Sequence, residues 1–213
     1  MRALLLSTVL LVAAASGLQP DPASAQPAPA GLSYFERLTL ANWKLTMKVD
    51  RSSEHWVPTG KLLIAARPTE VMDTFMDFGS YGRIMPKVKS CQLLRRRGPY
   101  EIWAMVVLEL PWPVANAWVA VKYDWKRLGT EGYHLRWERH RGSMSKYWGR
   151  LELVPWGKHW TLATSTMQAV PDSVVPRSKL NEGLVWGTGA LLHHLRQEVD
   201  RRRNARQLKP YPY

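Results

Sequence analysis

The chain has little cysteine, little phenylalanine and few acidic residues. Its 213 residues include one Cys, 3 Phe, and 17 Asp and Glu against 30 Lys and Arg, which gives a formal net charge of +13. The single Cys91 excludes an intramolecular disulfide, so the core must hold the fold, and we expect a buried, unreactive thiol. The basic excess indicates a polyanionic partner: nucleic acid inside a cell, or anionic lipid headgroups and similar polyanions outside it.

Beyond its N-terminus the sequence lacks an apolar run of the roughly 20 residues that span a membrane. The N-terminus itself has the layout of a secretory signal, with Arg2, an apolar run over 3–15 and a small-residue cleavage site at 23–25. We therefore expect export to the periplasm or beyond, with an uncleaved membrane anchor as the alternative, and no nucleic-acid partner. The predicted organisation is a signal peptide at 1–25, a flexible leader at 26–31, one domain at 32–203 and a basic tail at 204–213.

The sequence also lacks the residue patterns of common catalytic and cofactor sites. A Gly-x-Ser-x-Gly motif and the glycine motifs that bind phosphates or dinucleotides are absent. The six His residues are not spaced with carboxylates or cysteine as zinc ligands are. We expect no metal and no cofactor, and we assign no catalytic residue.

What the sequence has instead is alternation of apolar and polar residues typical of β-strands. A short helix is expected over 33–41, strands over 43–49 and 61–66, and a helix that begins at Pro68. Six further strands follow, joined mostly by short turns that contain Gly or Pro. They are predicted at 88–96, 101–110, 118–127, 133–141, 144–154 and 160–170. This order predicts an antiparallel meander.

One face of these strands is apolar and aromatic, and the other is charged. The chain contains 11 Trp, well above ordinary usage. A concave face rich in Trp, Tyr and Met suits a flat or chain-like hydrophobic ligand, although Trp can instead simply fill a large core. The candidate cavity residues on the strands are Trp103, Met105, Tyr123, Trp125, Trp137 and Tyr147.

A long amphipathic helix is predicted from Pro176 to Arg203. Its apolar stripe must face the sheet, and Gly183 and Gly187 fall on one shoulder of that stripe, although a glycine inside a helix costs about 0.5–1 kcal/mol relative to alanine. Either the missing side chains leave room for a ligand, or they allow close helix-on-sheet packing without a cavity. The candidate cavity residues on the helix are Leu184, Gly187, Thr188 and Leu191.

The outer face of the helix carries Trp186, nearly opposite the stripe, and its end is basic. Interfacial Trp with nearby cations is how peripheral proteins engage lipid headgroups. We therefore list Trp186, Arg201, Arg202 and Arg203 as candidate membrane contacts. The alternatives are that Trp186 packs under residues 32–43 and that the arginines complement the helix dipole.

An apolar loop follows the second strand of the meander. Two prolines prevent Pro111–Asn116 from joining the sheet, and the loop places Trp112 and Val114 where turns are ordinarily polar. Pro111, Trp112, Pro113 and Val114 are therefore candidate entrance residues, or else a rigid crossover whose Trp plugs the core.

Four passages resemble a known family. They are Ala65–Val71 with the following Met85-Pro86, the loop Leu110–Asn116, Gly149 with Leu151 and Pro155, and Ala169–Pro176 with Asn181. In this order they are similar to the START-like (SRPBCC) superfamily, which includes polyketide cyclases and dehydrases, coenzyme Q-binding proteins and the birch pollen allergen. The likeness covers about Trp43 to Val199.

The resemblance implies an α+β helix-grip fold: a curved antiparallel sheet wrapped around a long C-terminal helix, with a hydrophobic cavity between them. Ala117-Trp118 stands where the family usually has Arg-Asp, and Ile84 replaces an aromatic, so no cavity charge is carried over. The resemblance does not identify the ligand.

Three functions follow from these features. The leading hypothesis is a monomer that binds and transfers a hydrophobic small molecule or lipid, at times at an anionic membrane surface. The second is a cyclase or dehydratase that uses Tyr123, Tyr147 or Arg139 in the same cavity, as some family members use a cavity acid or base. The third is a basic module that binds anionic polymers on its surface.

Overall fold

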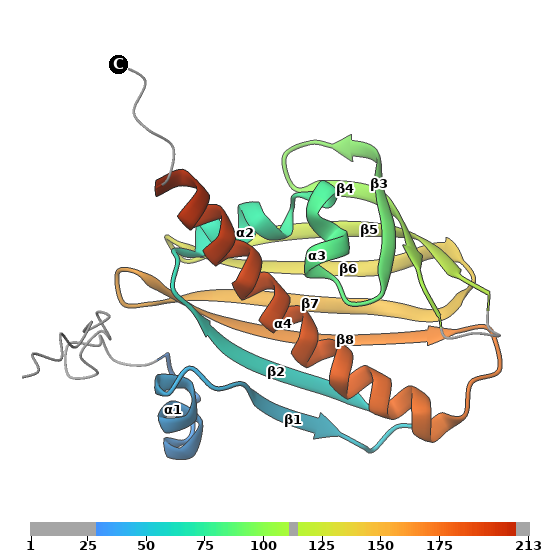
Figure 1. Cartoon of the computed structure of the whole chain (residues 1–213), viewed down its shortest axis with the longest axis horizontal. Coiled ribbons are helices and arrows are strands. Elements are labelled where there is room, and N and C mark those ends of the chain that lie inside the picture. The colour runs from blue at the N-terminus through green and yellow to red at the C-terminus, as the bar shows by residue number, and fades with distance from the viewer. Residues whose placement is uncertain (1–28, 111–114, 208–213) are drawn as a thin grey trace, which may run out of the picture.

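The computed structural model describes residues 29–110 and 115–207, and the side chains of these residues up to 205. The signal peptide and leader up to residue 28, the loop residues 111–114 and the tail from residue 208 lie outside them. Eight strands form one antiparallel sheet in the order β1-β2-β8-β7-β6-β5-β4-β3, and helix α4 crosses its concave face (Figure 1). The expected α+β helix-grip architecture is confirmed.

The elements follow the sequence pattern closely. They are α1 (Tyr34–Ala41), β1 (Thr46–Asp50), β2 (Val57–Ile64), α2 (Pro68–Phe75), the 3-10 turn η2 (Phe78–Ser80), α3 (Tyr81–Ile84), β3 (Val88–Arg97), β4 (Glu101–Leu108), β5 (Ala117–Leu128), β6 (Gly132–Gly142), β7 (Met144–Trp156), β8 (Trp160–Pro171) and α4 (Arg177–Gln207). Residues 80–82, expected as a turn, are helical, and α4 runs four residues past Arg203 because no glycine or proline intervenes before Pro210.

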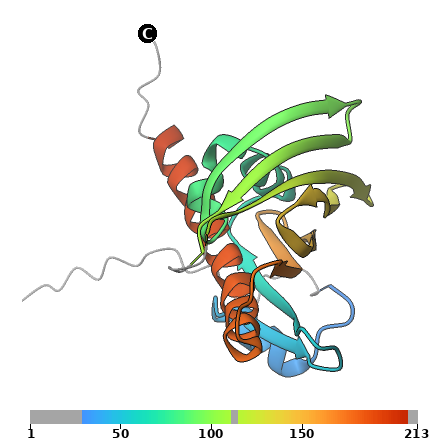
Figure 2. The same cartoon turned by 90° about the vertical axis from the view of Figure 1, so that its right-hand side faces the viewer.

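The sheet curls around its apolar face, as the view in Figure 2 shows. Alternation places Val121 and Tyr123 of β5 and Leu135 and Trp137 of β6 in the core. Trp137 lies directly across from Gly149 of β7, and its indole occupies the space that a side chain at Gly149 would need. At this position Trp fills the core, as the alternative interpretation expected.

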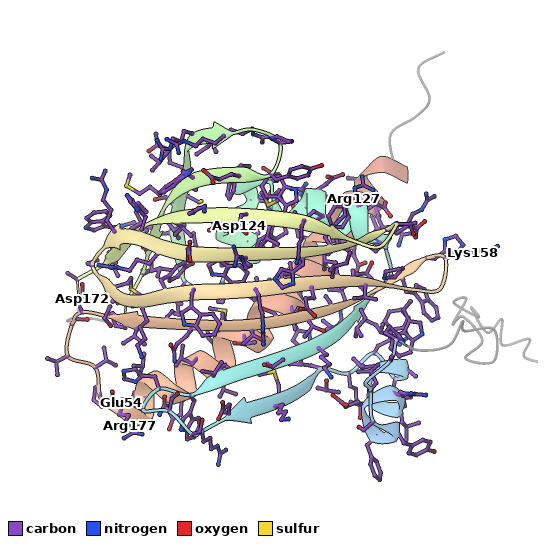
Figure 3. All side chains as sticks on the ribbon, turned by 180° about the vertical axis from the view of Figure 1, so that it is seen from behind. Glu54, Asp124, Arg127, Lys158, Asp172 and Arg177 are labelled. Atoms are coloured by element: carbon purple, nitrogen blue, oxygen red, sulfur yellow. The ribbon has the colours of Figure 1, made fainter. Side chains whose placement is uncertain are left out.

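The opposite face of the sheet, toward the viewer in Figure 3, carries the charged residues of β5 and β6. There Arg136 donates to Asp124 across β5 and β6 at 2.9 Å, and Figure 3 labels Asp124 on this face. Helix α1 also packs on this face, because Leu40 joins Leu63 and Leu162, and Leu63 points away from its neighbours Leu62 and Ile64, which lie in the main core. The N-terminal segment therefore does not cover Trp186.

Helix α4 packs differently on its two sides. Toward β1 and β2 it packs closely, since a Cβ on Gly60 of β2 would lie 3.0 Å from Leu192 and a Cβ on Gly189 would lie 3.0 Å from Leu45. On the other side, a Cβ on Gly183 would meet nothing within 4 Å. Both predicted uses of the glycines occur: Gly189 permits close packing, and Gly183 and Gly187 border open space.

The end of α4 is fixed by a buried carboxylate. Glu198 is 3% exposed and accepts hydrogen bonds from Arg201 at 2.7 Å, Arg202 at 3.0 Å and Arg83 of α3 at 3.1 Å. Hydrogen bonds from Arg201 above all, then from Arg83 and Arg202, hold the pKa of Glu198 well below its usual range. Arg202 also contacts Asp77, so the network ties the last turns of α4 to the connection before β3. None of the helices in the described part of the chain is long and apolar enough to cross a membrane.

Candidate functional site

An apolar groove of about 280 Å³ lies between the first turns of α4 and the sheet. Its walls come from the start of β3, the end of β4, the start of β7, the end of β8 and the first turns of α4. The apolar lining residues include Met85, Val88, Leu108, Met144, Met167 and Leu184. The volume is near the lower end of the range for small-molecule pockets.

The charged residues that line the groove are Lys87, Glu109 and Lys179, and all three are exposed. They therefore stand at the rim, and the interior offers apolar surface. Lys87 has a positive φ of 62°, a backbone region that a residue with a side chain rarely adopts. Its carbonyl accepts a 2.8 Å hydrogen bond from the backbone N–H of Glu109, which joins the two sides of the rim.

The only polar side chain that lines the interior of the groove in the described residues is Tyr147. It is 2% exposed, and its hydroxyl has no hydrogen-bond partner there. Burial, and to a smaller extent the nearby Cys91, raises the pKa of Tyr147 well above its ordinary value. The phenol therefore stays protonated and can donate a hydrogen bond. Partial burial likewise raises the pKa of the Cys91 thiol to about 12, which disfavours the reactive thiolate, although the side chain is half-buried and not buried as expected.

The candidate cavity residues fall into three groups. Tyr147, Leu184 and Gly187 line the groove. Behind its walls lie buried Tyr123, Trp137, Thr188 and Leu191, where Thr188 donates to the Leu184 carbonyl at 3.0 Å. The remaining three, Trp103, Met105 and Trp125, lie away from the groove.

The expected register of β4 is corrected by one residue. Ile102, Ala104, Val106 and Leu108 are buried, so Trp103 and Met105 point to the other face. There the Trp103 ring stacks against Arg95, whose guanidinium carbon lies 4.5 Å from the ring centroid, and its indole N–H donates to Glu101 at 2.8 Å. The sequence misled because the residues on both faces of β4 are apolar.

Two further aromatic and basic candidates also lie elsewhere. Trp125 is half-buried in a separate cleft at the opposite end of the sheet, with its ring 6.2 Å from that of Tyr100. Arg139, the candidate acid or base of the enzyme hypothesis, is exposed and donates to the Gly142 carbonyl at 3.1 Å. The pairing of β5 with β6 is irregular just after Arg139, between its partner Val121 and Ala120.

The candidate membrane contacts lie at two separate places. Trp186 is 54% exposed beside the groove, next to Lys179, while Arg201 and Arg202 are bound to Glu198 about 22 Å further along α4 at 1.5 Å per residue. Arg203 is half-buried. The entrance residues 111–114 lie outside the described part of the chain, but the preceding Leu108, Glu109 and Leu110 line the groove.

Several groove residues were missed by the sequence analysis. Met144 begins β7 and Met167 lies within β8, and the apolar alternation of these strands could have found them. Val175 and Lys179 reach the groove only through the path of the chain into α4. Leu180, in the apolar stripe of the helix, and Gly183, beside that stripe, also line the groove but were not predicted as cavity residues.

No protein-family model matches this sequence, and no curated protein is significantly similar to it. Solved structures are similar in fold. A fragment of a STAR-related lipid transfer protein from Xanthomonas axonopodis superposes with a TM-score of 0.62 at 20% identity, covering 74% of this chain and 93% of that one. Human STARD10 gives a TM-score of 0.66 at 10% identity, with 89% and 86% covered.

An enzyme shares the fold as well. The ZhuI aromatase/cyclase from Streptomyces sp. R1128 superposes with a TM-score of 0.55 at 14% identity, covering 76% of this chain and 98% of that one. Lipid-transfer domains and a cyclase thus share this arrangement of a sheet and a terminal helix. Sequence identities this low establish similarity of fold and nothing about function. From its topology, its groove and these likenesses, this chain has the START-like helix-grip fold.

Proposed function

We propose that this protein binds a hydrophobic small molecule or single-chain lipid in the groove beneath α4 and carries it outside the cytoplasm. The observation that carries the proposal is an apolar groove of about 280 Å³ whose charged lining residues are confined to its rim. A volume at the lower end of the range for small-molecule pockets suits one chain or one ring system better than two acyl chains. The similarity in fold to lipid-transfer domains supports the proposal of a hydrophobic ligand.

Export and membrane contact are part of the proposal. The N-terminal signal pattern favours a periplasmic or secreted protein. At the groove mouth Trp186, Lys179 and Lys87 are exposed, and Val174, just before α4, is 95% exposed. Apolar side chains flanked by lysines suit a surface of anionic headgroups. Lys179 forms a 3.0 Å ion pair with Glu182, but both side chains are exposed, where such a pair is weak. We favour this face over Arg201 and Arg202, which are held by the buried carboxylate of Glu198.

The enzyme alternative has one supporting observation, the ZhuI likeness, and two opposing observations. Tyr147 is the groove residue that could act in catalysis, but its raised pKa keeps it from serving as a general base near neutral pH. Arg139 lies outside the groove. We therefore favour binding over catalysis.

The experiment is identification of the bound molecule. The protein is produced with its full N-terminus, recovered from the periplasm and examined by native mass spectrometry, followed by organic extraction. A copurifying hydrophobic molecule, or saturable binding of one single-chain lipid from a broad panel, supports the proposal. Binding of none of them, together with salt-sensitive binding of polyanions, would favour the surface-module hypothesis instead.

A further inference from the structure

Three buried tyrosines form the inner wall beside the groove, and their hydroxyls are unpartnered. Tyr147 of β7, Tyr123 of β5 and Tyr81 of α3 are each at most 2% exposed. Within the residues that the structure describes, none of the three hydroxyls has a hydrogen-bond partner. We call these residues the tyrosine wall.

The three hydroxyls are neighbours. The rings of Tyr81 and Tyr123 lie 6.3 Å apart at 75°. Burial first of all raises the pKa of Tyr81, and the nearby Cys91 and Tyr147 raise it further. Burial is also the main cause of the raised pKa of Tyr123, with Tyr81, Tyr147 and Cys91 as smaller causes. Tyr147 lines the groove. Tyr81 and Tyr123 lie behind it, and their two hydroxyls are close enough to interact with each other but outside hydrogen-bond geometry, so among the described residues the Tyr147 hydroxyl is the one without any neighbouring donor or acceptor in hydrogen-bond contact.

Such an arrangement is unusual in a folded protein. A buried hydroxyl that has left water without gaining a partner destabilises the fold, so nearly all buried polar groups are paired. Three phenylalanines would fill nearly the same volume without this cost. The position of the tyrosines beside the groove indicates that their partner enters through it.

The chemistry of the wall restricts that partner. Phenols with raised pKa values remain neutral and are available to donate to an oxygen acceptor. A buried carboxylate or phosphate needs a cation beside it, and the cations that line the groove, Lys87 and Lys179, are exposed at its rim. A pure hydrocarbon would leave the hydroxyls unpaired.

We propose that the ligand carries a neutral oxygen acceptor, such as a ketone or ester carbonyl, that enters first and accepts a hydrogen bond from Tyr147, with Tyr123 and Tyr81 supporting that hydroxyl from behind. This inference rests on the proposed function, because it concerns the same groove. It names the ligand class as apolar molecules with a neutral carbonyl at the buried end. Any charged group of the ligand lies at the rim, near the lysines.

The test compares two probes of matched shape, nonan-2-one labelled with ¹³C at its carbonyl and n-nonane, on the wild-type chain and on Tyr147→Phe. We expect the carbonyl resonance of nonan-2-one to move downfield on binding to the wild type, as it does when a carbonyl accepts a hydrogen bond. In Tyr147→Phe the downfield shift is lost and nonan-2-one binds about three- to tenfold more weakly, the range for one net hydrogen bond. Binding of n-nonane is unchanged or tighter.

Controls separate this inference from the proposed function. Tyr133→Phe removes a buried phenol at the other end of the sheet, outside the groove, and should leave both probes unaffected. Tyr123→Phe is measured in parallel and should reduce the carbonyl shift, so the test survives if one variant fails to fold. If Tyr147→Phe weakens both probes equally, or the shift persists, the carbonyl inference is overturned while the groove remains a binding site. If neither probe binds the wild type, both proposals are overturned.

Discussion

Filling the groove from the helix side should abolish binding without harming the fold. Gly187 is buried in α4 at the wall of the groove, and a Cβ added there would meet only Pro86, at 4.0 Å, among atoms within 4 Å. In Gly187→Leu the four side-chain carbons enter the space that a ligand would occupy. A ligand that loses contacts worth up to four methylene groups, at about 0.8 kcal/mol each, loses about 3 kcal/mol, which is about 200-fold in Kd.

The stability of Gly187→Leu should increase although its affinity for the ligand falls. Replacing a glycine inside a helix gains about 0.5–1 kcal/mol, and the new side chain buries apolar surface against the groove lining. We therefore expect Gly187→Leu to raise Tm while it weakens nonan-2-one binding, measured by calorimetry or by NMR titration. A higher Tm together with weaker binding would show that the new side chain fills the groove and that binding is not lost because the fold is destabilised.

The matched control is the glycine on the other shoulder of the helix. A Cβ on Gly189 would lie 3.0 Å from Leu45, so Gly189→Leu forces this packing apart and should cost about 1–3 kcal/mol of stability. Gly189 does not line the groove, so the folded variant should bind nonan-2-one like the wild type. The reasoning would be refuted if Gly187→Leu were folded and bound nonan-2-one within twofold of the wild type.

Three further results are expected. Glu198→Gln should lower the free energy of unfolding by about 2–4 kcal/mol at pH 7, because it uncouples buried hydrogen bonds to Arg83 and its neighbours. Since the folded-state pKa of Glu198 is depressed, its contribution to stability is complete above the ordinary pKa of 4.5 and is lost as the pH falls below that value. In chemical denaturation, the free energy of unfolding of the wild type should therefore fall more steeply at acid pH than that of Glu198→Gln. Gly149→Ala should lower the free energy of unfolding, measured by thermal denaturation, by about 2–3 kcal/mol, because its methyl group would overlap the indole of Trp137. Adding Trp137→Leu should restore part of this stability, and additive losses in the double variant would contradict the explanation. Trp186→Ala should reduce cosedimentation with phosphatidylglycerol vesicles severalfold with little change in Tm, and a large fall in Tm would show that this half-exposed indole is instead a packing residue.

Much of the fold could be read from the sequence because strand and helix periods are local properties. Hairpin turns at Gly98, Gly129 and Gly157 have positive φ values, which glycine adopts readily, and the six meander strands lie within a few residues of their predicted ranges. The stripe predicted from Leu180 to Val199 is buried from Leu184 onward, because 3.6-residue periodicity decides which side of a helix faces a core, while Leu180 is half-buried at the groove.

The site was only partly predictable because a groove depends on distances between elements. Tyr147, Leu184 and Gly187 were found from alternation and from the helix wheel. Trp103 was misplaced because both faces of β4 carry apolar residues, so alternation gave no direction. Lys87 could not be found, since only the meeting of the start of β3 with the end of β4 places it at the rim.

By itself, then, the sequence determined a meander of alternating strands, one long terminal helix, its buried stripe and the glycines beside it, since each depends on the order of neighbouring residues. Tertiary structure alone decided that the side of the helix with Gly183 and Gly187 borders a groove, whereas the side with Gly189 packs closely. It also brought Tyr81, Tyr123 and Tyr147 together from three different elements. The physical reason is that a cavity and a cluster of unpaired hydroxyls arise from how surfaces fit in space, which no local period records.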